Sequence, residues 1–183
     1  MPMLKNHVRR KLEKYVRKYF KKHHPTLIVV VGAVGKTTTK TAIATVLSQR
    51  FRVGMEPENH NSELSVPLAL MGVKYPPSDL LRKISTWHRI FRAMKARIKN
   101  GQGVDVIIQE LGSDHPGDLA VFAKYLEADI AVVTSVAAEH LENFWNGLSD
   151  VALEELLLHV LAKSLWSTHH GRCRTFVNVL NAC

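Results

Sequence analysis

A lysine and three threonines follow two glycines early in the chain, in the stretch GAVGKTTTK at residues 32–40. Glycines let backbone amides turn toward a bound anion without a Cβ in the way, and a helix N-terminus adds partial positive charge. A lysine here can reach the β- and γ-phosphates of a nucleotide, and the next threonine hydroxyl can serve Mg²⁺. The stretch therefore predicts that Lys36 contacts phosphates and that Thr37 is a metal ligand.

The common phosphate-loop pattern G-x-x-x-x-G-K-[ST] requires a glycine at residue 30, where this chain has Val30. The alternative interpretation is an ordinary strand–turn–helix whose lysine faces solvent. The context favours a phosphate loop, because an apolar strand-like run precedes the glycines and a helix-like segment follows at once.

Three apolar runs in the chain are predicted strands: TLIVVV (26–31), VDVIIQ (104–109) and DIAVVTSV (129–136). Helices are expected between them, at 35–50 and around 117–126. Apolar runs without alternation, separated by helices, indicate a parallel sheet covered on both faces. The predicted fold is α/β, a three-layer sandwich like that of P-loop NTPases, with a mostly parallel sheet.

In open parallel sheets, ligands bind beyond the carboxyl ends of the strands. The second predicted strand ends at Glu110, and His140 follows the third. Both side chains are therefore expected at the same edge as the glycine loop. A carboxylate is a hard oxygen ligand that suits Mg²⁺, whereas an imidazole is not a preferred one. From the residues alone, a solvated loop acid and a structural histidine remain the alternatives.

Four stretches resemble, in order and spacing, the central ATPase domain of the Mur ligases, over about residues 26–155: GAVGKTTTK, ENHNSELSVPLALMG, QELGSDHPGDLA and DIAVVTSVAAEHLENF. The branch that adds D-alanyl-D-alanine is the most similar. The loop of that family has the form G-x-x-G-K-T-T, which this chain satisfies, so Val30 is no obstacle.

The resemblance implies a set of site residues. Lys36, Glu110 and His140 would be catalytic, and Thr37, Glu110 and His140 would contact the metal. The nucleotide would be held by Gly32, Ala33, Val34, Gly35, Lys36, Thr37, Thr38, Asn59 and Asn61, with Ser62 in the same polar segment.

The function implied is an ATP-dependent carboxylate–amine ligase of peptidoglycan precursor synthesis, acting through an acyl phosphate. Its cofactors would be ATP and Mg²⁺, and its substrate a peptidoglycan precursor. Two alternatives stay open: a folylpolyglutamate-type ligase, and a non-catalytic ATP-binding protein that docks to a membrane or partner through basic helices.

The chain also departs from the family pattern. Most Mur ligases carry a lysine, carboxylated in the mature enzyme, downstream of the histidine; here Glu154 or Glu155 stands near that place. We expect residues 1–25 to form a basic amphipathic helix where the family has a precursor-binding domain, and residues 26–157 to form the ATPase-like domain. Residues 158–183 are expected to be an atypical tail, and the sequence leaves open whether it is native or truncated. We expect this module to be inactive alone without a C-terminal domain.

The net charge of +9 is concentrated at the N-terminus, where residues 1–24 hold nine Lys or Arg against one acid. A second basic segment, 80–99, holds seven Lys or Arg around an apolar stripe with Trp87. These segments could meet an anionic membrane surface, or pack their stripes on the core with a solvated cationic face. No recognised motif supports nucleic acid as a partner. The two cysteines, Cys173 and Cys183, fit a reducing compartment, so we expect a cytoplasmic protein, with association to a membrane surface left as an alternative.

Overall fold

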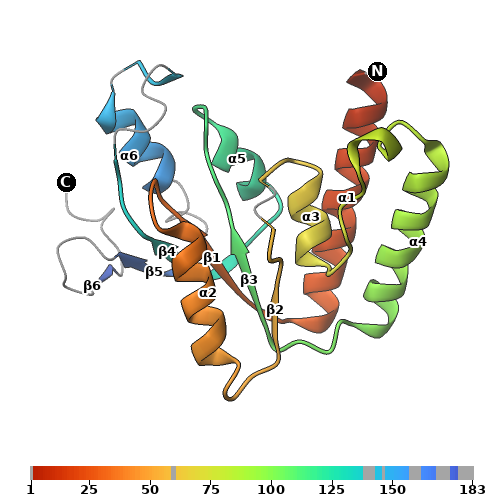
Figure 1. Cartoon of the computed structure of the whole chain (residues 1–183), viewed down its shortest axis with the longest axis horizontal. Coiled ribbons are helices and arrows are strands. Elements are labelled where there is room, and N and C mark those ends of the chain that lie inside the picture. The colour runs from red at the N-terminus through yellow and green to blue at the C-terminus, as the bar shows by residue number, and fades with distance from the viewer. Residues whose placement is uncertain are drawn as a thin grey trace.

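A computed structural model describes residues 2–58, 61–137, 143–145, 147–156, 162–167 and 174–176. Its strands form one sheet in the order β2-β3-β1-β4-β5-β6 (Figure 1). The strands are β1 (Thr26–Val31), β2 (Val53–Met55), β3 (Val106–Glu110), β4 (Ala128–Val133), β5 (Ala162–Ser167) and β6 (Arg174–Phe176). All neighbouring pairs are parallel except β5 and β6, which are antiparallel. The predicted α/β fold with a mostly parallel sheet is confirmed.

The central strand β1 shows why the apolar runs do not alternate. Leu27, Val29 and Val31 belong to the larger core on one face of the sheet, whereas Ile28 and Val30 belong to the smaller core on the other. Both faces of the strand are therefore covered, and every second position is as apolar as its neighbours.

Helices form the two outer layers. On the larger core lie α1 (Pro2–His23), α3 (Ser65–Leu70), α4 (Ile84–Asn100) and α5 (Asp118–Ala123), and on the smaller core lies α2 (Lys36–Leu47). A 3₁₀ turn, η1 (Ser78–Leu80), precedes α4, and α6 (Leu148–Leu156) follows β4 in the chain.

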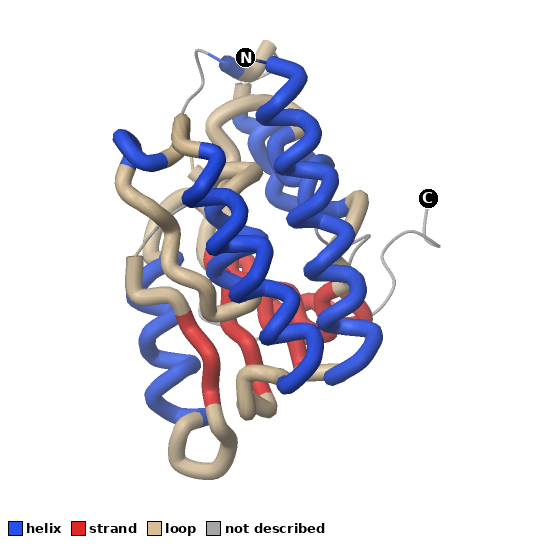
Figure 2. Tube along the Cα trace, turned by 90° about the vertical axis from the view of Figure 1, so that its right-hand side faces the viewer, coloured by secondary structure: helices blue, strands red, loops and turns tan. Residues whose placement is uncertain are grey.

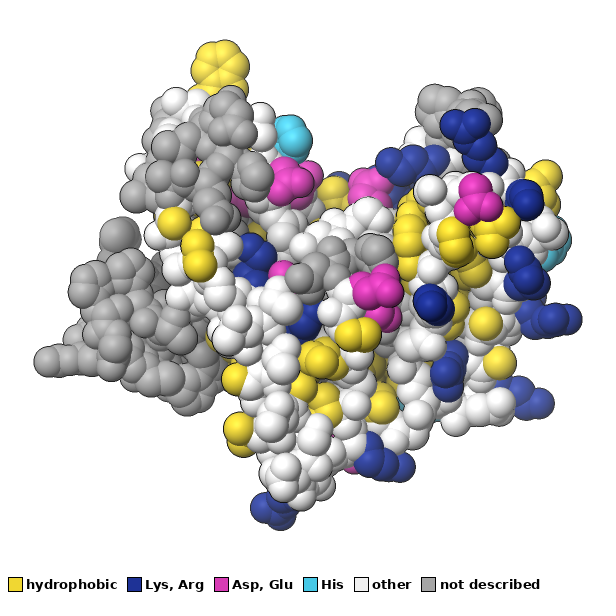
Figure 3. Space-filling view, in the orientation of Figure 1, with side chains coloured by type: hydrophobic (Ala, Val, Ile, Leu, Met, Phe, Trp, Pro, Cys, Tyr) yellow, Lys and Arg dark blue, Asp and Glu magenta, His cyan; other side chains and the backbone are white. Residues whose placement is uncertain are grey.

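The two basic helices α1 and α4 run side by side (Figure 2). Their apolar stripes face the core: Leu12 and Val16 of α1 and Met94 of α4 are fully buried. Trp87 is also buried, and its indole nitrogen donates to the Leu81 carbonyl oxygen at 2.8 Å. The structure therefore has the core-packed arrangement, and the cations stay outside, along the right-hand side of Figure 3.

The C-terminal ends of α1 and α4 are held together by side chains that cap carbonyl groups. His23 Nε2 lies 2.9 Å from the Ile98 oxygen, and Lys22 Nζ donates to the Lys99 oxygen at 2.9 Å. Cations near a helix C-terminus also interact favourably with its dipole. Within the residues described, no helix is both long enough and apolar enough to span a bilayer.

The register of the sheet aligns the carboxyl ends of β1, β3 and β4, at or after which the predicted catalytic residues lie in the sequence. Val30 of β1 is paired with Glu110 of β3, and Val31 is paired with Val133 of β4. Because the three strands are parallel, the residues that follow each of them leave the sheet at the same edge. That edge carries the candidate site.

Candidate functional site

The glycine loop, residues 32–35, leaves β1 and enters α2 directly. Gly32 has φ 121° and Gly35 has φ 87°, both in the region that favours glycine. A Cβ on Gly32 would lie 2.4 Å from Thr134 Oγ1 and 2.7 Å from the Ser135 carbonyl oxygen. Gly32 is therefore required both by its backbone conformation and by the close approach of the chain after β4.

Ser135 holds the loop in this shape. Its carbonyl oxygen accepts from the Ala33 amide at 2.9 Å, and its Oγ accepts from the Val34 amide at 2.9 Å. The Ala33 and Val34 amides are thus used to fix the loop. The amide donors that remain at the loop's end are those of the first turn of α2, which an α-helix leaves without intrahelical partners.

Lys36, the first residue of α2, folds back over the loop. Its ammonium group donates to the carbonyl oxygens of Gly32 at 2.5 Å and Ala33 at 2.8 Å. The side chain is only partly buried. Its charge is therefore held above the loop by carbonyl groups, which are weaker partners than a phosphate.

Three side chains meet at the end of β3. Thr37 Oγ1 donates to Glu110 Oε2 at 3.0 Å, and Lys40 Nζ lies 3.2 Å from the same oxygen. Lys40 also donates to the Glu56 carbonyl oxygen at 3.1 Å. The side chains of Lys40 and Glu110 are 3% and 4% exposed, so this is a buried ion pair.

A small cavity of about 90 Å³ adjoins the loop. Lys36, Asn61 and Glu154 all line it, from three separate segments of the chain. Gly112, just after β3, makes room for Asn61, because a Cβ on that glycine would lie 2.9 Å from Asn61 Nδ2.

Glu154 of α6 is buried, and its carboxylate faces the N-terminus of α5. Its Oε2 accepts from the Gly117 amide and its Oε1 from the Leu119 amide, each at 2.8 Å. The carboxylate thus satisfies two donors that the helix start would otherwise leave unpaired. These bonds join α6 to α5 and keep a fixed negative charge beside the cavity.

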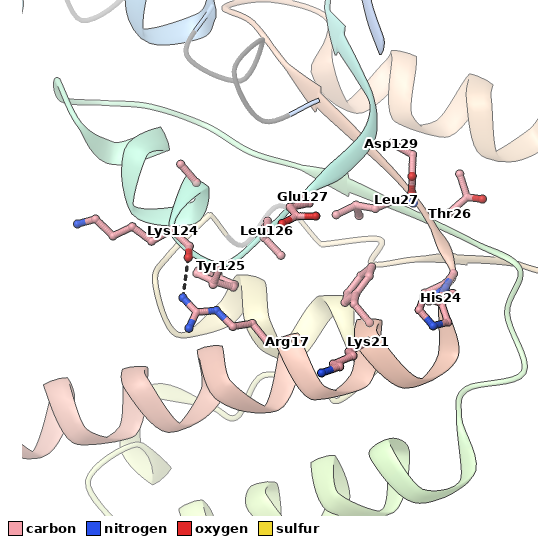
Figure 4. A pocket seen from close by; sticks show the side chains of 13 residues that line it. Arg17, Lys21, His24, Thr26, Leu27, Lys124, Tyr125, Leu126, Glu127 and Asp129 are labelled. Atoms are coloured by element: carbon pink, nitrogen blue, oxygen red, sulfur yellow. Dashed lines mark hydrogen bonds between the residues drawn. The ribbon is translucent and has the colours of Figure 1, made fainter. Parts of the chain in front are cut away.

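A larger hollow, of about 600 Å³, lies at the opposite, amino ends of β1 and β4 (Figure 4). Arg17 and Lys21 of α1 reach it, and Arg17 donates to the Lys124 carbonyl oxygen at 2.6 Å. Asp129 uses Oδ2 to accept from the Leu27 amide at 2.9 Å. Burial raises the pKa of Tyr125 there, so that phenol stays protonated.

Comparison with known proteins shows the family to which the chain belongs. The family described as "Mur ligase middle domain" matches residues 30–163, well over half of the chain. The chain belongs to the Mur ligase family.

Two relatives of this Mur ligase chain, from different bacteria, carry the same name. A UDP-N-acetylmuramoyl-tripeptide–D-alanyl-D-alanine ligase from Synechocystis is 30% identical over 74% of this chain and 23% of its own length. The enzyme of that name from Bacillus subtilis is 21% identical over 78% of this chain and 26% of its own. The chain therefore spans about a quarter of the length of these relatives.

Solved structures agree on the fold. The MurF ligase from Thermotoga maritima, crystallised with ADP, has a TM-score of 0.63 and 24% identity, covering 85% of this chain and 30% of that one. A MurF from Acinetobacter baumannii has a TM-score of 0.62 and 19% identity, covering 84% of this chain and 28% of that one.

The structure brings Lys36, Thr37, Glu110 and Asn61 of this Mur ligase domain to the same edge as the glycine loop, residues 32–35. Asn59 and His140 lie outside the described residues, so their predicted roles stay predictions. Ser62 forms reciprocal hydrogen bonds with Ser65, three residues further along the chain. Its Oγ accepts from the Ser65 amide at 3.1 Å, and its own amide donates to Ser65 Oγ at 2.9 Å.

Of the two candidates for the position of the carboxylated lysine, Glu154 lines the cavity, and the side chain of Glu155 is not among those described. Lys40 and Ser135 also contribute contacts at this edge, and no sequence motif predicted them. The spacing of Lys40, three residues after Thr37 on a helix, is a signal that could have placed it on the same face.

The donors at the carboxyl edge suit a magnesium ion that arrives with a nucleotide. Thr37 and Glu110 supply hard oxygens, whereas the described residues contain no group of three His, Cys, Asp or Glu able to hold a metal. Mg²⁺ commonly takes one or two protein ligands together with substrate phosphates and water. The residues present fit that arrangement and do not fit an all-protein metal cage.

Proposed function

We propose that this chain is the ATPase module of an ATP-dependent carboxylate–amine ligase of peptidoglycan precursor synthesis. The observation that carries the proposal is the meeting of the glycine loop, Thr37 and Glu110 at the carboxyl edge of the sheet. Family membership and the names of the relatives support it. We place the nucleotide unit in residues 26–157.

In this proposal, Lys36 leaves the loop carbonyls and binds the β- and γ-phosphates of ATP. The amides at the start of α2 bind the same phosphates, Thr38 and the remaining loop residues shape their site, and Asn59 and Asn61 border the nucleotide. Thr37, Glu110 and His140 would hold Mg²⁺, which supplies charge neutralisation for phosphoryl transfer. The similar MurF ligase from Thermotoga maritima was solved in complex with ADP, which supports the choice of nucleotide.

The chemistry follows from the weakness of a carboxylate as an electrophile. A substrate carboxylate oxygen attacks the γ-phosphorus of ATP, the bond to the bridging oxygen breaks, and ADP leaves. The acyl phosphate is then attacked at its carbonyl carbon by an amine, and inorganic phosphate leaves as the new C–N bond forms and the amine loses a proton. The protein contributes position and charge rather than a nucleophile of its own.

The test is calorimetric titration of the chain with Mg-ATP. Lys36→Ala should lower the affinity at least tenfold, because a charge-assisted contact to the phosphates is lost. Lys74→Ala, an exposed lysine outside the site, should bind like the wild type. Equal affinity in the wild type and Lys36→Ala would contradict the loop assignment.

The substrate class needs a separate assay, because a folylpolyglutamate-type ligase would use the same loop. Phosphate release by the chain, supplemented with the other domains of a MurF relative, should rise with a UDP-linked muramoyl peptide and not with a folate. Stimulation by a folate would instead favour the alternative ligase. Tight ATP binding without stimulation by either substrate would favour the non-catalytic alternative.

We also propose an anionic membrane surface as a partner. A groove of about 620 Å³ between α1 and α4 is lined by Arg10, Lys11, Lys14, Lys18 and Lys95, with no carboxylate among its lining residues. Because the apolar stripes beneath are buried, contact with lipid would be electrostatic, at about 1 kcal/mol per cation near the surface.

Sedimentation with phosphatidylglycerol vesicles tests this partner. The wild type should pellet at low salt and be released at high salt, and a Lys11→Glu/Lys14→Glu/Lys18→Glu variant should stay in the supernatant. Binding that survives high salt, or that is equal on neutral phosphatidylcholine vesicles, would contradict the electrostatic docking.

A further inference from the structure

Lys40 is a buried lysine that none of the site assignments above uses. It lies one turn after Lys36 on α2, and its Nζ is 3.2 Å from Glu110 Oε2. An ammonium group is very unfavourable in a protein interior unless a counter-charge and hydrogen bonds compensate it. Glu110 provides the charge, and the Glu56 carbonyl oxygen, at 3.1 Å, provides a further acceptor.

The contacts of the Glu110 carboxylate with Thr37 and Lys40 are made by one of its two oxygens. Thr37 Oγ1 and Lys40 Nζ both meet Oε2, at 3.0 and 3.2 Å. Among the described residues, Oε1 of Glu110 makes no hydrogen bond. Lys40 and Thr37 together therefore fix the orientation of the carboxylate by one oxygen and leave the other to meet a cation.

Lys40 also changes what a free divalent cation would encounter. The nearest carboxylate is already half of an ion pair, and Lys36 adds a second positive charge over the loop. Two carboxylates line the cavity itself: Asp114, which follows β3, and Glu154, whose oxygens accept from the amides of Gly117 and Leu119. A triphosphate would reverse this balance, because it brings several negative charges to the same edge.

We propose that Lys40 is a positioning residue that makes divalent-cation binding at Glu110 depend on the nucleotide. The proposal rests on the proposed function, since it needs a nucleotide at the loop. Linkage requires the coupling to be reciprocal: the factor by which ATP strengthens metal binding equals the factor by which metal strengthens ATP binding. Lys40 raises that factor by weakening metal binding to the nucleotide-free protein.

The experiment measures both sides of the coupling. Electron paramagnetic resonance gives the affinity for Mn²⁺ with and without a non-hydrolysable ATP analogue, and calorimetry gives the affinity for the analogue with Mg²⁺ and with a chelator. In Lys40→Met, Mn²⁺ should bind the nucleotide-free protein about tenfold more tightly. The coupling factor in this variant should fall by the same ratio. Its affinity for the analogue in the absence of metal should lie within about threefold of the wild-type affinity.

Three variants serve as controls. Lys40→Arg keeps the charge and should keep the wild-type coupling, Lys74→Met should change nothing, and Glu110→Gln should abolish the metal effect in both assays. If Lys40→Met does not fold, as judged by circular dichroism, Lys40→Gln replaces it. Glutamine keeps a hydrogen-bond donor without the charge, and the same change is expected.

A coupling factor that is unchanged in the folded Met or Gln variant overturns the role of Lys40 while leaving the proposed function in place. A wild-type chain that binds no nucleotide at all overturns the proposed function, and the role of Lys40 with it.

Discussion

The two ends of the sheet hold charged side chains of the same kinds and use them differently. At the carboxyl ends, the cavity is only about 90 Å³, and the ion pair between Lys40 and Glu110 at the same edge of the sheet is buried. At the amino ends, the hollow is about 600 Å³, and Glu127 and Lys124, which line it, are exposed. Cavity size alone would favour the amino end, whereas the proposed site lies at the carboxyl end. Buried charges with fixed partners mark the place where the fold holds side chains in one geometry, which is what binding and catalysis need.

The largest expected loss of stability comes from adding a side chain to the glycine loop at the carboxyl edge. Gly32→Ala should destabilise the chain by about 3 kcal/mol or more, because a Cβ would meet Thr134 and Ser135 in a backbone conformation that alanine disfavours. Urea unfolding followed by circular dichroism measures the loss.

Gly35→Ala is the matched control for Gly32→Ala. It has a positive φ of 87° but open space around its Cβ position. Only backbone strain of about 1–2 kcal/mol is expected there. Equal losses in the two alanine variants would show that the chain after β4 does not restrict the loop.

An intermediate loss of stability is expected when the buried carboxylate of α6 is removed. Glu154→Ala leaves the amides of Gly117 and Leu119 without their acceptors and should cost about 2–4 kcal/mol of unfolding free energy. The control at the other end of the sheet is Glu127→Ala, an exposed acid, which should change stability by no more than about 0.5 kcal/mol. Similar losses of unfolding free energy in the two variants would show that the acidic side chains at the two ends of the sheet do not differ in their contribution to stability.

The smallest effect concerns an exposed ion pair near the amino ends of β2 and β3. Arg52 binds Asp105 through Nη2 at 2.6 Å and Nε at 3.0 Å, and these hydrogen bonds lower the pKa of Asp105 from 3.8 to about 2. A lowered pKa in the folded chain means stabilisation that is present above about pH 4 and is lost as the pH falls through 2.

Asp105→Asn should therefore reduce the melting temperature slightly at pH 6 and leave it unchanged near pH 2. Scanning calorimetry at the two pH values measures both differences. A melting temperature of Asp105→Asn that matches the wild type at pH 6 would show that solvent screening removes the contribution of the pair altogether.

Much of the fold was predictable because its signals are local. The apolar runs of β1 and β3 are buried apart from Thr26, and that of β4 is buried or half-buried, so sequence composition alone identifies them. The helix stripe around Trp87 and Met94 was predicted as well, but the sequence left open whether a membrane or the core covers it. That choice depends on α1, which is distant in sequence and supplies the covering side chains.

The candidate site was predictable in its parts and not in its connections. Lys36, Thr37 and Glu110 follow from the motif and from strand direction. Lys40 carries no motif of its own, and Ser135 follows β4, about a hundred residues from the loop it holds. Contacts across such separations depend on how the strands are ordered and paired, which no local pattern encodes.

Two features can be predicted from the residues without a structure: a glycine loop with a lysine and threonines ends one buried strand, and a carboxylate ends another. These are properties of residue type and short-range spacing, since backbone freedom and donor chemistry belong to each residue wherever it lies. Two contacts, in contrast, arise from the folding of the chain: Thr37 and Lys40 share one oxygen of Glu110, and Glu154 accepts from amides at the start of α5. Distances of about 3 Å between such groups are set by parallel register and by the packing of helices on the sheet, which exist only in the folded chain.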